Sequence, residues 1–273
     1  MISSLIIALR ETLEAAVIIG LIVGYLNKTG QQVYKKTVAL AVTVAVVASL
    51  VGAWLFNMLA GGFEGRSEQI FEGVTMMISA LLLTTMIFFV MGHKNLGQEL
   101  ASSLSQKINQ QQKWGLFFLV FFSIFREGIE LVLFLKTASL VSPDNNLLGA
   151  VLGIAIAIIL GYVMFAELMR FDIKKFINIT GVILILFAAG LVAHGIHEFQ
   201  EAGVMPIIIE HVWDINPPIN SDGSFPTLHE NGWFGSILKG LLGYNGNPSL
   251  LELIGYIIYL LIIAVVWKKT VKK

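Results

Sequence analysis

The sequence contains no cysteine among its 273 residues, and charged side chains make up only 13% of them. The absence of cysteine excludes disulfide bonds, thiolate metal sites and cysteine nucleophiles. It also argues against a site for soft metals, which prefer sulfur ligands. Soluble domains carry about 25% charged residues, whereas 56% of this chain is hydrophobic. The composition therefore predicts an integral membrane protein.

Acidic and basic residues balance at 18 each, so the chain has no net charge with which to attract nucleic acid, and we predict no nucleic-acid partner. The first apolar stretch, residues 2–26, lacks a basic start and a small-residue cleavage site, and it carries Arg10. We interpret it as a retained membrane span and not as a signal peptide.

Seven apolar segments approach or exceed the roughly 20 helical residues needed to cross a hydrocarbon core. The sequence therefore predicts an all-α, polytopic membrane protein that forms one transmembrane domain over 1–273, with no soluble domain. The predicted spans lie near 2–26, 37–60, 70–92, 115–136, 147–168, 176–197 and 250–267.

The distribution of basic residues predicts the orientation. Most of them lie in the connections 27–36, 93–114 and 169–175 and in the C-terminal tail. The positive-inside rule then places the N-terminus outside and the C-terminus inside. The opposite face is acidic, chiefly in the long connection 198–249. This connection is rich in proline, glycine and asparagine, and we expect it to be irregular apart from a short helix over Trp233 to Leu242.

Two of the predicted membrane helices carry the same motif, Arg-Glu-x-x-Glu, at Arg10–Glu14 and at Arg126–Glu130. One charged residue near the middle of a membrane helix costs about 2.5–3.5 kcal/mol, so three cost roughly 9 kcal/mol. About fifteen apolar neighbours at roughly 0.5 kcal/mol each offset a similar amount. Each helix is therefore marginal alone and needs partners. Ionisable residues in such places indicate a functional site.

The two motif copies lie in the first and fourth predicted spans. Three spans separate them, so the second copy crosses the membrane in the opposite direction. This arrangement is typical of an inverted-topology repeat, with repeat 1 at about 1–92, repeat 2 at about 115–197, and the span 250–267 added. Transporters of this kind bind their substrate near the midplane, between the repeats.

The spacing within each motif brings its charged side chains to one helix face, because residues three and four apart are neighbours on a helix. If the two helices pack together, four carboxylates converge with two arginines. The carboxylates are Glu11, Glu14, Glu127 and Glu130, and the supporting arginines are Arg10 and Arg126. Small residues at Thr12 and Gly128 would let the helices approach closely.

An oxygen-only site of this kind suits iron, manganese, calcium or magnesium. The alternative is a pair of buried Arg-Glu contacts that hold helices together. Such contacts stabilise weakly because desolvation offsets the attraction, and they need only one carboxylate each.

A second cluster follows at the outer end of the sixth predicted span. Its members share one helix face, and they could receive metal from outside or gate its entry; the alternative is a solvated, polar helix end. Glu72 is the most membrane-embedded of three glutamates that lead into the third span. A pair in the outer loop is a weaker candidate for metal capture. The cluster is His194, His197, Glu198 and Glu201, and the loop pair is His211 and Asp214.

The paired motif resembles the hallmark of the oxidase-dependent iron permease family, which includes the fungal high-affinity iron permease and the bacterial elemental-iron uptake permeases. The resemblance covers essentially the whole chain. Phe71-Glu72-Gly73 and the run from Gly195 to Gly203 also look like family features. One departure is Thr12, where the commonest family form has glycine.

The resemblance implies a transporter and not an enzyme, with iron as the transported substrate and no resident cofactor. It implies a multi-pass protein of the cell membrane, the cytoplasmic membrane in a bacterium, surrounded by lipid. An extracytoplasmic iron oxidase or iron-delivery protein is the implied partner, and the oxidation state of the iron stays open, as does the oligomeric state.

Two other functions stay open. The family includes relatives linked to lead uptake, so the chain could carry lead, manganese or another multivalent cation. A membrane-embedded metal oxidase is the other alternative. Di-iron bundles pair Glu-x-x-His motifs with further glutamates, and neither motif here contains histidine.

Overall fold

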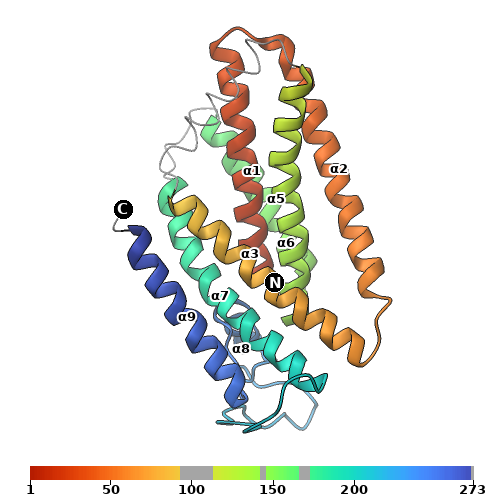
Figure 1. Ribbon diagram of the computed structural model, residues 1–273, viewed down its shortest axis with the longest axis vertical. Coiled ribbons are helices and arrows are strands. Elements are labelled where there is room, and N and C mark those ends of the chain that lie inside the picture. Colours follow the sequence, from red (N-terminus) through yellow and green to blue (C-terminus); the bar gives the residue numbers. More distant parts are fainter. Residues whose placement is uncertain (93–112, 142–145, 166–172, 272–273) are drawn as a thin grey trace.

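The computed structural model describes residues 1–92, 113–141, 146–165 and 173–271, and these are mostly helical with no strand among them (Figure 1). The predicted all-α, polytopic architecture is confirmed at this level. A short 3-10 turn, η1, spans Gln32–Tyr34. The α-helices are α1 (Ile2–Lys28), α2 (Lys35–Ala60), α3 (Arg66–Gly92), α5 (Lys113–Val141), α6 (Asn146–Phe165), α7 (Ile173–Glu201), α8 (Trp233–Leu242) and α9 (Leu250–Val271).

Each of the seven predicted spans coincides with one long helix. Five of these helices, α2, α3, α6, α7 and α9, are long and apolar enough to cross a membrane. The other two, α1 and α5, carry the two charged motifs, so hydropathy alone does not identify them as spans. The short helix α8 begins and ends at the predicted residues.

Two helix boundaries differ from the predictions. Helix α7 runs to Glu201, so the irregular connection begins after this residue and not at 198. The helix ends in a Schellman motif, because Gly203 has φ +66° and the Val204 N–H donates to the Phe199 carbonyl. Helix α5 continues to Val141, so Lys136 is helical and not part of a connection. The basic connections predicted over 93–114 and 169–175 lie largely outside the described residues.

The helices form two groups that meet at the motifs. Figure 1 shows α1, α2, α5 and α6 side by side in one group, and α3, α7 and α9 in the other. The most extensive packing joins α1 to α6, α3 to α7, and α2 to α5. Helices α1 and α5 also contact each other directly and run in opposite directions, as the chain order in Figure 1 shows.

The charged motifs form a polar layer between two hydrophobic clusters. Along α1, Ile7 belongs to the first cluster and Ile22 to the second, with Arg10–Glu14 between them. Along α5 the order is reversed, since Ile124 belongs to the second cluster and Phe134 to the first. Apolar packing on both sides therefore holds the two motifs at the same level.

Glycines bring the helix backbones into direct contact. On α6, a Cβ at Gly149 or Gly153 would overlap the α1 backbone at Met1 or Leu5. On α5, a Cβ at Gly128 would overlap the side chain of Ser49 on α2. The small residue expected at position 128 is thus required by the packing.

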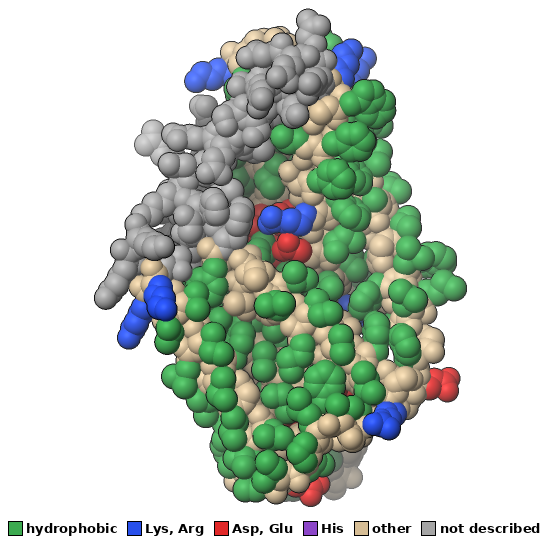
Figure 2. Space-filling model, in the orientation of Figure 1, with side chains coloured by type: hydrophobic (Ala, Val, Ile, Leu, Met, Phe, Trp, Pro, Cys, Tyr) green, Lys and Arg blue, Asp and Glu red, His purple; other side chains and the backbone are tan. Residues whose placement is uncertain are grey.

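The outer surface is that of a membrane protein. Figure 2 shows a face covered mainly by hydrophobic side chains, with charged side chains toward its ends and one charged group in the middle. Helix α2 contributes large exposed residues such as Leu50, Trp54 and Met58. Such a continuous apolar surface is stable against lipid and not against water.

Candidate metal site between α1 and α5

The two motifs have the same local geometry. Arg10 lies 3.2 Å from Glu11 through Nη1 and 3.1 Å from Glu14 through Nε. In the second copy, Arg126 Nη2 lies 3.2 Å from Glu127 Oε1, and Arg126 Nε lies 3.1 Å from Glu130 Oε1. Each guanidinium therefore holds both carboxylates of its own motif, as the i, i+1 and i, i+4 spacing on a helix allows.

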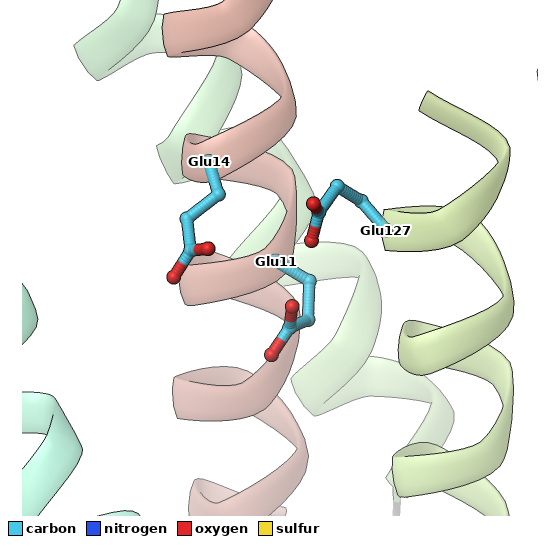
Figure 3. A group of neighbouring side chains, drawn as sticks. All are labelled: Glu11, Glu14 and Glu127. Carbon is cyan, nitrogen blue, oxygen red and sulfur yellow. The ribbon is translucent and has the colours of Figure 1, made fainter. Parts of the chain in front are cut away.

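The carboxylates of the two helices converge. Glu11, Glu14 and Glu127 each offer one oxygen atom, and these atoms all lie within 4.8 Å of one another. Figure 3 shows Glu127 reaching from α5 toward α1, from which Glu11 and Glu14 project. Glu130 lies at the edge of this group of three, beside Arg126. With two arginines and four glutamates, the layer carries a formal charge of −2.

Several carboxylate oxygens in this layer have no hydrogen-bond partner among the described residues. They are buried, and one belongs to each of the four glutamates: Glu11 Oε2, Glu14 Oε1, Glu127 Oε2 and Glu130 Oε2. Glu14 Oε1 is close to Arg10 Nε, but the angle is not that of a hydrogen bond. A buried oxygen left without a partner loses free energy. A bound cation would satisfy such oxygens, although Nε and Nη2 of Arg10 are likewise buried without a hydrogen-bond partner among the described residues.

Among the described residues, the layer is accessible beside Arg126. The side chain of Arg10 is fully buried, whereas that of Arg126 is 48% exposed. Arg126 and Glu130 line a cavity of about 240 Å³ with Leu82, Thr85 and Met86 of α3. Figure 2 shows basic and acidic side chains together in the middle of an otherwise hydrophobic face. A cation could reach the carboxylates from this side.

The second predicted cluster lies at the C-terminal end of α7, and most of it lines a cavity that is separate from the carboxylate layer. His194, His197 and His211 line this cavity, together with Glu201 and other carboxylates. We call it the histidine pocket. The sequence paired His211 with Asp214 in the outer loop; the structure instead places it in one cavity with the two histidines of α7.

Glu252, at the start of α9, is the residue that sequence reasoning missed. Its Oε1 lies 3.0 Å from His197 Nδ1, and its Oε2 accepts a hydrogen bond of 2.6 Å from Asn245. His197 Nε2 lies 3.2 Å from Glu201 Oε1, so this imidazole bridges two carboxylates. An acidic residue inside the apolar run that begins at Leu250 was the available signal.

Three predicted residues, Glu72, Glu198 and Asp214, do not line the histidine pocket. Glu198 is within electrostatic range of Glu68 and Glu72 on α3, and it does not line the pocket. Asp214 accepts a hydrogen bond from the Asn216 backbone and likewise is not part of the lining. The predicted pairing of His211 with Asp214 is therefore absent from the pocket.

The helices and the carboxylate layer define a class of protein, a multi-pass membrane protein with a cluster of buried carboxylates among its helices. A family model, the iron permease FTR1 family, matches residues 1–273, and the chain belongs to this family. It is a transporter family, so the expectation of a transporter and not an enzyme is confirmed.

Similar proteins include the ferrous iron permease EfeU of Escherichia coli O6:K15:H31 (strain 536 / UPEC), which is 30% identical over 262 residues, or 94% of this chain and 91% of the relative. EfeU of Yersinia pestis is 31% identical over 262 residues, or 94% of this chain and 89% of the relative. No solved structure gives a significant match.

Proposed function

We propose that the chain takes up iron into the cell and binds it between α1 and α5 through Glu11, Glu14, Glu127 and Glu130. Arg10 and Arg126 orient these carboxylates and balance their charge when the cation has left. The observation that carries the proposal is the set of four buried carboxylate oxygens, one per glutamate, without hydrogen-bond partners among the described residues. Carboxylate oxygens are suitable ligands for iron and for harder cations.

The membrane arrangement is part of the proposal. Seven helices cross the membrane, and α1 and α5 do so because their charges are buried against partner helices. The packing pattern supports an inverted repeat of α1–α3 and α5–α7. In this repeat, α1 corresponds to α5, α2 to α6 and α3 to α7. The contact of α1 with α6 therefore corresponds to that of α5 with α2, and the contacts of α1 with α5 and of α3 with α7 each correspond to themselves. A two-fold axis in the membrane plane relates contacts in this reciprocal way.

The orientation has the N-terminus outside and the C-terminus inside. Lys28, Lys35 and Lys113 lie at the ends of α1, α2 and α5 that meet on one side, which supports this orientation under the positive-inside rule. The acidic connection after α7 then lies outside, where an iron oxidase or an iron-delivery protein would supply the cation. The relatives named ferrous iron permeases favour Fe(II) as the form taken up.

Uptake of radioactive iron into proteoliposomes tests the site. Single replacements of the four glutamates by glutamine keep the side-chain volume and remove the charge. Each should lower uptake by at least about tenfold, because even changes in the outer shell of a metal site cost about 10–100-fold in affinity or activity. Glu64→Gln, an exposed glutamate before α3, is the matched control.

Uptake at the unsubstituted rate by both Glu14→Gln and Glu127→Gln would show that the site lies elsewhere. The same assay with Mn(II) and Pb(II) as competitors decides between iron and another multivalent cation. Running it with Fe(II) under reducing conditions, and with Fe(III), determines the oxidation state.

A further inference from the structure

A second cavity, the histidine pocket, lies outside the carboxylate layer between α1 and α5. It is about 310 Å³ in volume and is enclosed by the end of α7, the following connection, α8 and the start of α9. A single water molecule needs roughly 10–15 Å³ of such space. The pocket therefore has room for a cation together with part of its water shell.

Hydrogen bonds select, in two of its histidines, the neutral tautomer that can bind a metal through Nε2. His194 Nδ1 lies 3.0 Å from the Gly190 carbonyl oxygen, and His211 Nδ1 lies 3.0 Å from the Asn247 carbonyl oxygen. A carbonyl oxygen only accepts hydrogen bonds, so Nδ1 must carry the proton in both rings. The other nitrogen, Nε2, then has a free lone pair when the ring is neutral. Metal-binding histidines are oriented in this way by a backbone carbonyl.

Carboxylates give the pocket its charge. Glu201, Glu210, Glu230 and Glu252 line it, against a single lysine, Lys239. Burial alone would raise the pKa of Glu230, but Lys239 and the backbone N–H of Gly246 outweigh it and lower that pKa, so this carboxylate is charged at neutral pH. The lining as a whole attracts cations.

The combination of imidazole and carboxylate determines which cation fits. Imidazole nitrogen is a ligand for iron, zinc, copper and nickel, whereas magnesium and calcium prefer oxygen ligands alone. We propose that the histidine pocket is a second cation site, which takes a divalent transition metal through Nε2 of His194 or His211 and the neighbouring carboxylates. This proposal stands whether or not iron binds between α1 and α5.

The pocket binds the cation loosely. Among the described residues, only Glu11, Glu14 and Glu127 bring three ligand atoms within 4.8 Å of one another. The ligand atoms of the histidine pocket are spread more widely, so a cation there keeps water molecules in its coordination shell. Weak binding by few direct ligands allows rapid release, as a transit site requires. The imidazoles favour transition metals over magnesium and calcium, a preference that the oxygen-only layer lacks.

Binding of Co(II) to the full-length protein tests the proposal. The protein is purified in detergent with an affinity tag that contains no histidine, and it carries Glu11→Gln and Glu127→Gln to disable the carboxylate layer. We expect this protein to bind Co(II) in the presence of excess Mg(II). Adding His194→Gln and His211→Gln should weaken Co(II) binding by about tenfold or more, the lower end of effects seen for metal-site changes.

His229→Gln is the matched control, because His229 is a histidine of the same outer region that does not line the pocket. Its Nδ1 instead accepts a hydrogen bond from the Asn231 backbone. If the doubly substituted protein does not fold, the single change His211→Gln gives the test, since this exposed residue lies outside the helices. Absence of Co(II) binding before the histidines are changed, or equal binding after, would refute the site.

Discussion

Arg10 and Arg126 occupy matching positions in the two motifs and hold their glutamates at the same distances, yet the side chain of Arg10 is fully buried and that of Arg126 is 48% exposed. The two halves of the molecule are thus alike in local geometry and unlike in access. Arg126 borders the cavity against α3, so the carboxylate layer can exchange with its surroundings on the α5 side.

This difference predicts unequal effects of removing the two arginines. Arg10→Ala leaves the buried Glu11 and Glu14 without a countercharge, and breaking a buried ion pair in this way costs about 3–5 kcal/mol. Arg126→Ala should cost less free energy of unfolding. This side chain is 48% exposed, so the glutamate charge that it leaves behind is partly stabilised by the surroundings. Thermal unfolding of both purified variants in the same detergent measures the difference. Equal losses would contradict the asymmetry.

Gly128→Ala should destabilise the packing of α5 against α2. The added methyl group would overlap Ser49, and overpacking of this kind costs about 1–3 kcal/mol. Ser49→Gly removes the overlapping group and should restore stability in the double variant. Gly24→Ala is the control, because no atom lies within 4 Å of a Cβ at that position, and alanine is the better helix former by up to about 1 kcal/mol. Thermal unfolding of the four proteins gives the comparison.

Glu252→Ala should loosen the attachment of α9 to α7. The substitution removes the partner of His197, Asn245 and the Ser249 backbone at once. The buried N–H of Ser249 left without a partner costs about 1–3 kcal/mol, and the partly exposed His197 and Asn245 lose a contact that joins α9 to its neighbours. Hydrogen exchange in α9 should therefore increase, while exchange in α2, which lies in the other helix group, stays unchanged. An increase spread evenly over both helices would mean a general loss of stability.

We predict that the region around α8 loses order at low pH, where Glu230 becomes protonated. Its pKa in the folded protein is lowered, so its contribution to stability is complete above the ordinary glutamate pKa of about 4.3 and is lost as the pH falls below it. As the pH falls below about 4.3, hydrogen exchange in α8, normalised for the intrinsic rate, should increase relative to its value at neutral pH. Glu230→Gln should exchange faster at neutral pH and show a smaller pH dependence.

Much of the fold follows from the sequence. Long apolar runs predicted the positions of α2, α3, α6, α7 and α9, because a stretch of about 20 apolar residues has few alternatives to a membrane helix. The ends of α8 were predicted to the residue, since Gly232 and Gly243 flank an apolar stretch. The motifs were predicted to place both glutamates on one face with their arginine, and local helix geometry alone determines this.

The rest depends on contacts between distant segments. The unequal burial of Arg10 and Arg126 arises from which helices cover each of them, and identical motifs carry no information about it. Glu252 was missed because one acidic residue in an apolar run does not reveal that His197 and Asn245 surround it. The predicted span ends at 197 and the helix at Glu201, because polar residues at the end of an apolar run do not show where a helix stops.

The glycines of α6 have a mechanical consequence. At Gly149 and Gly153 the backbones of α1 and α6 touch with no side chain between them. Separating these two helices would break this direct backbone contact, because glycine has no side chain to fill the space left between them. We therefore expect a movement that separates Glu14 from Glu127 to displace α1 and α6 together, as one rigid unit, relative to α2 and α5.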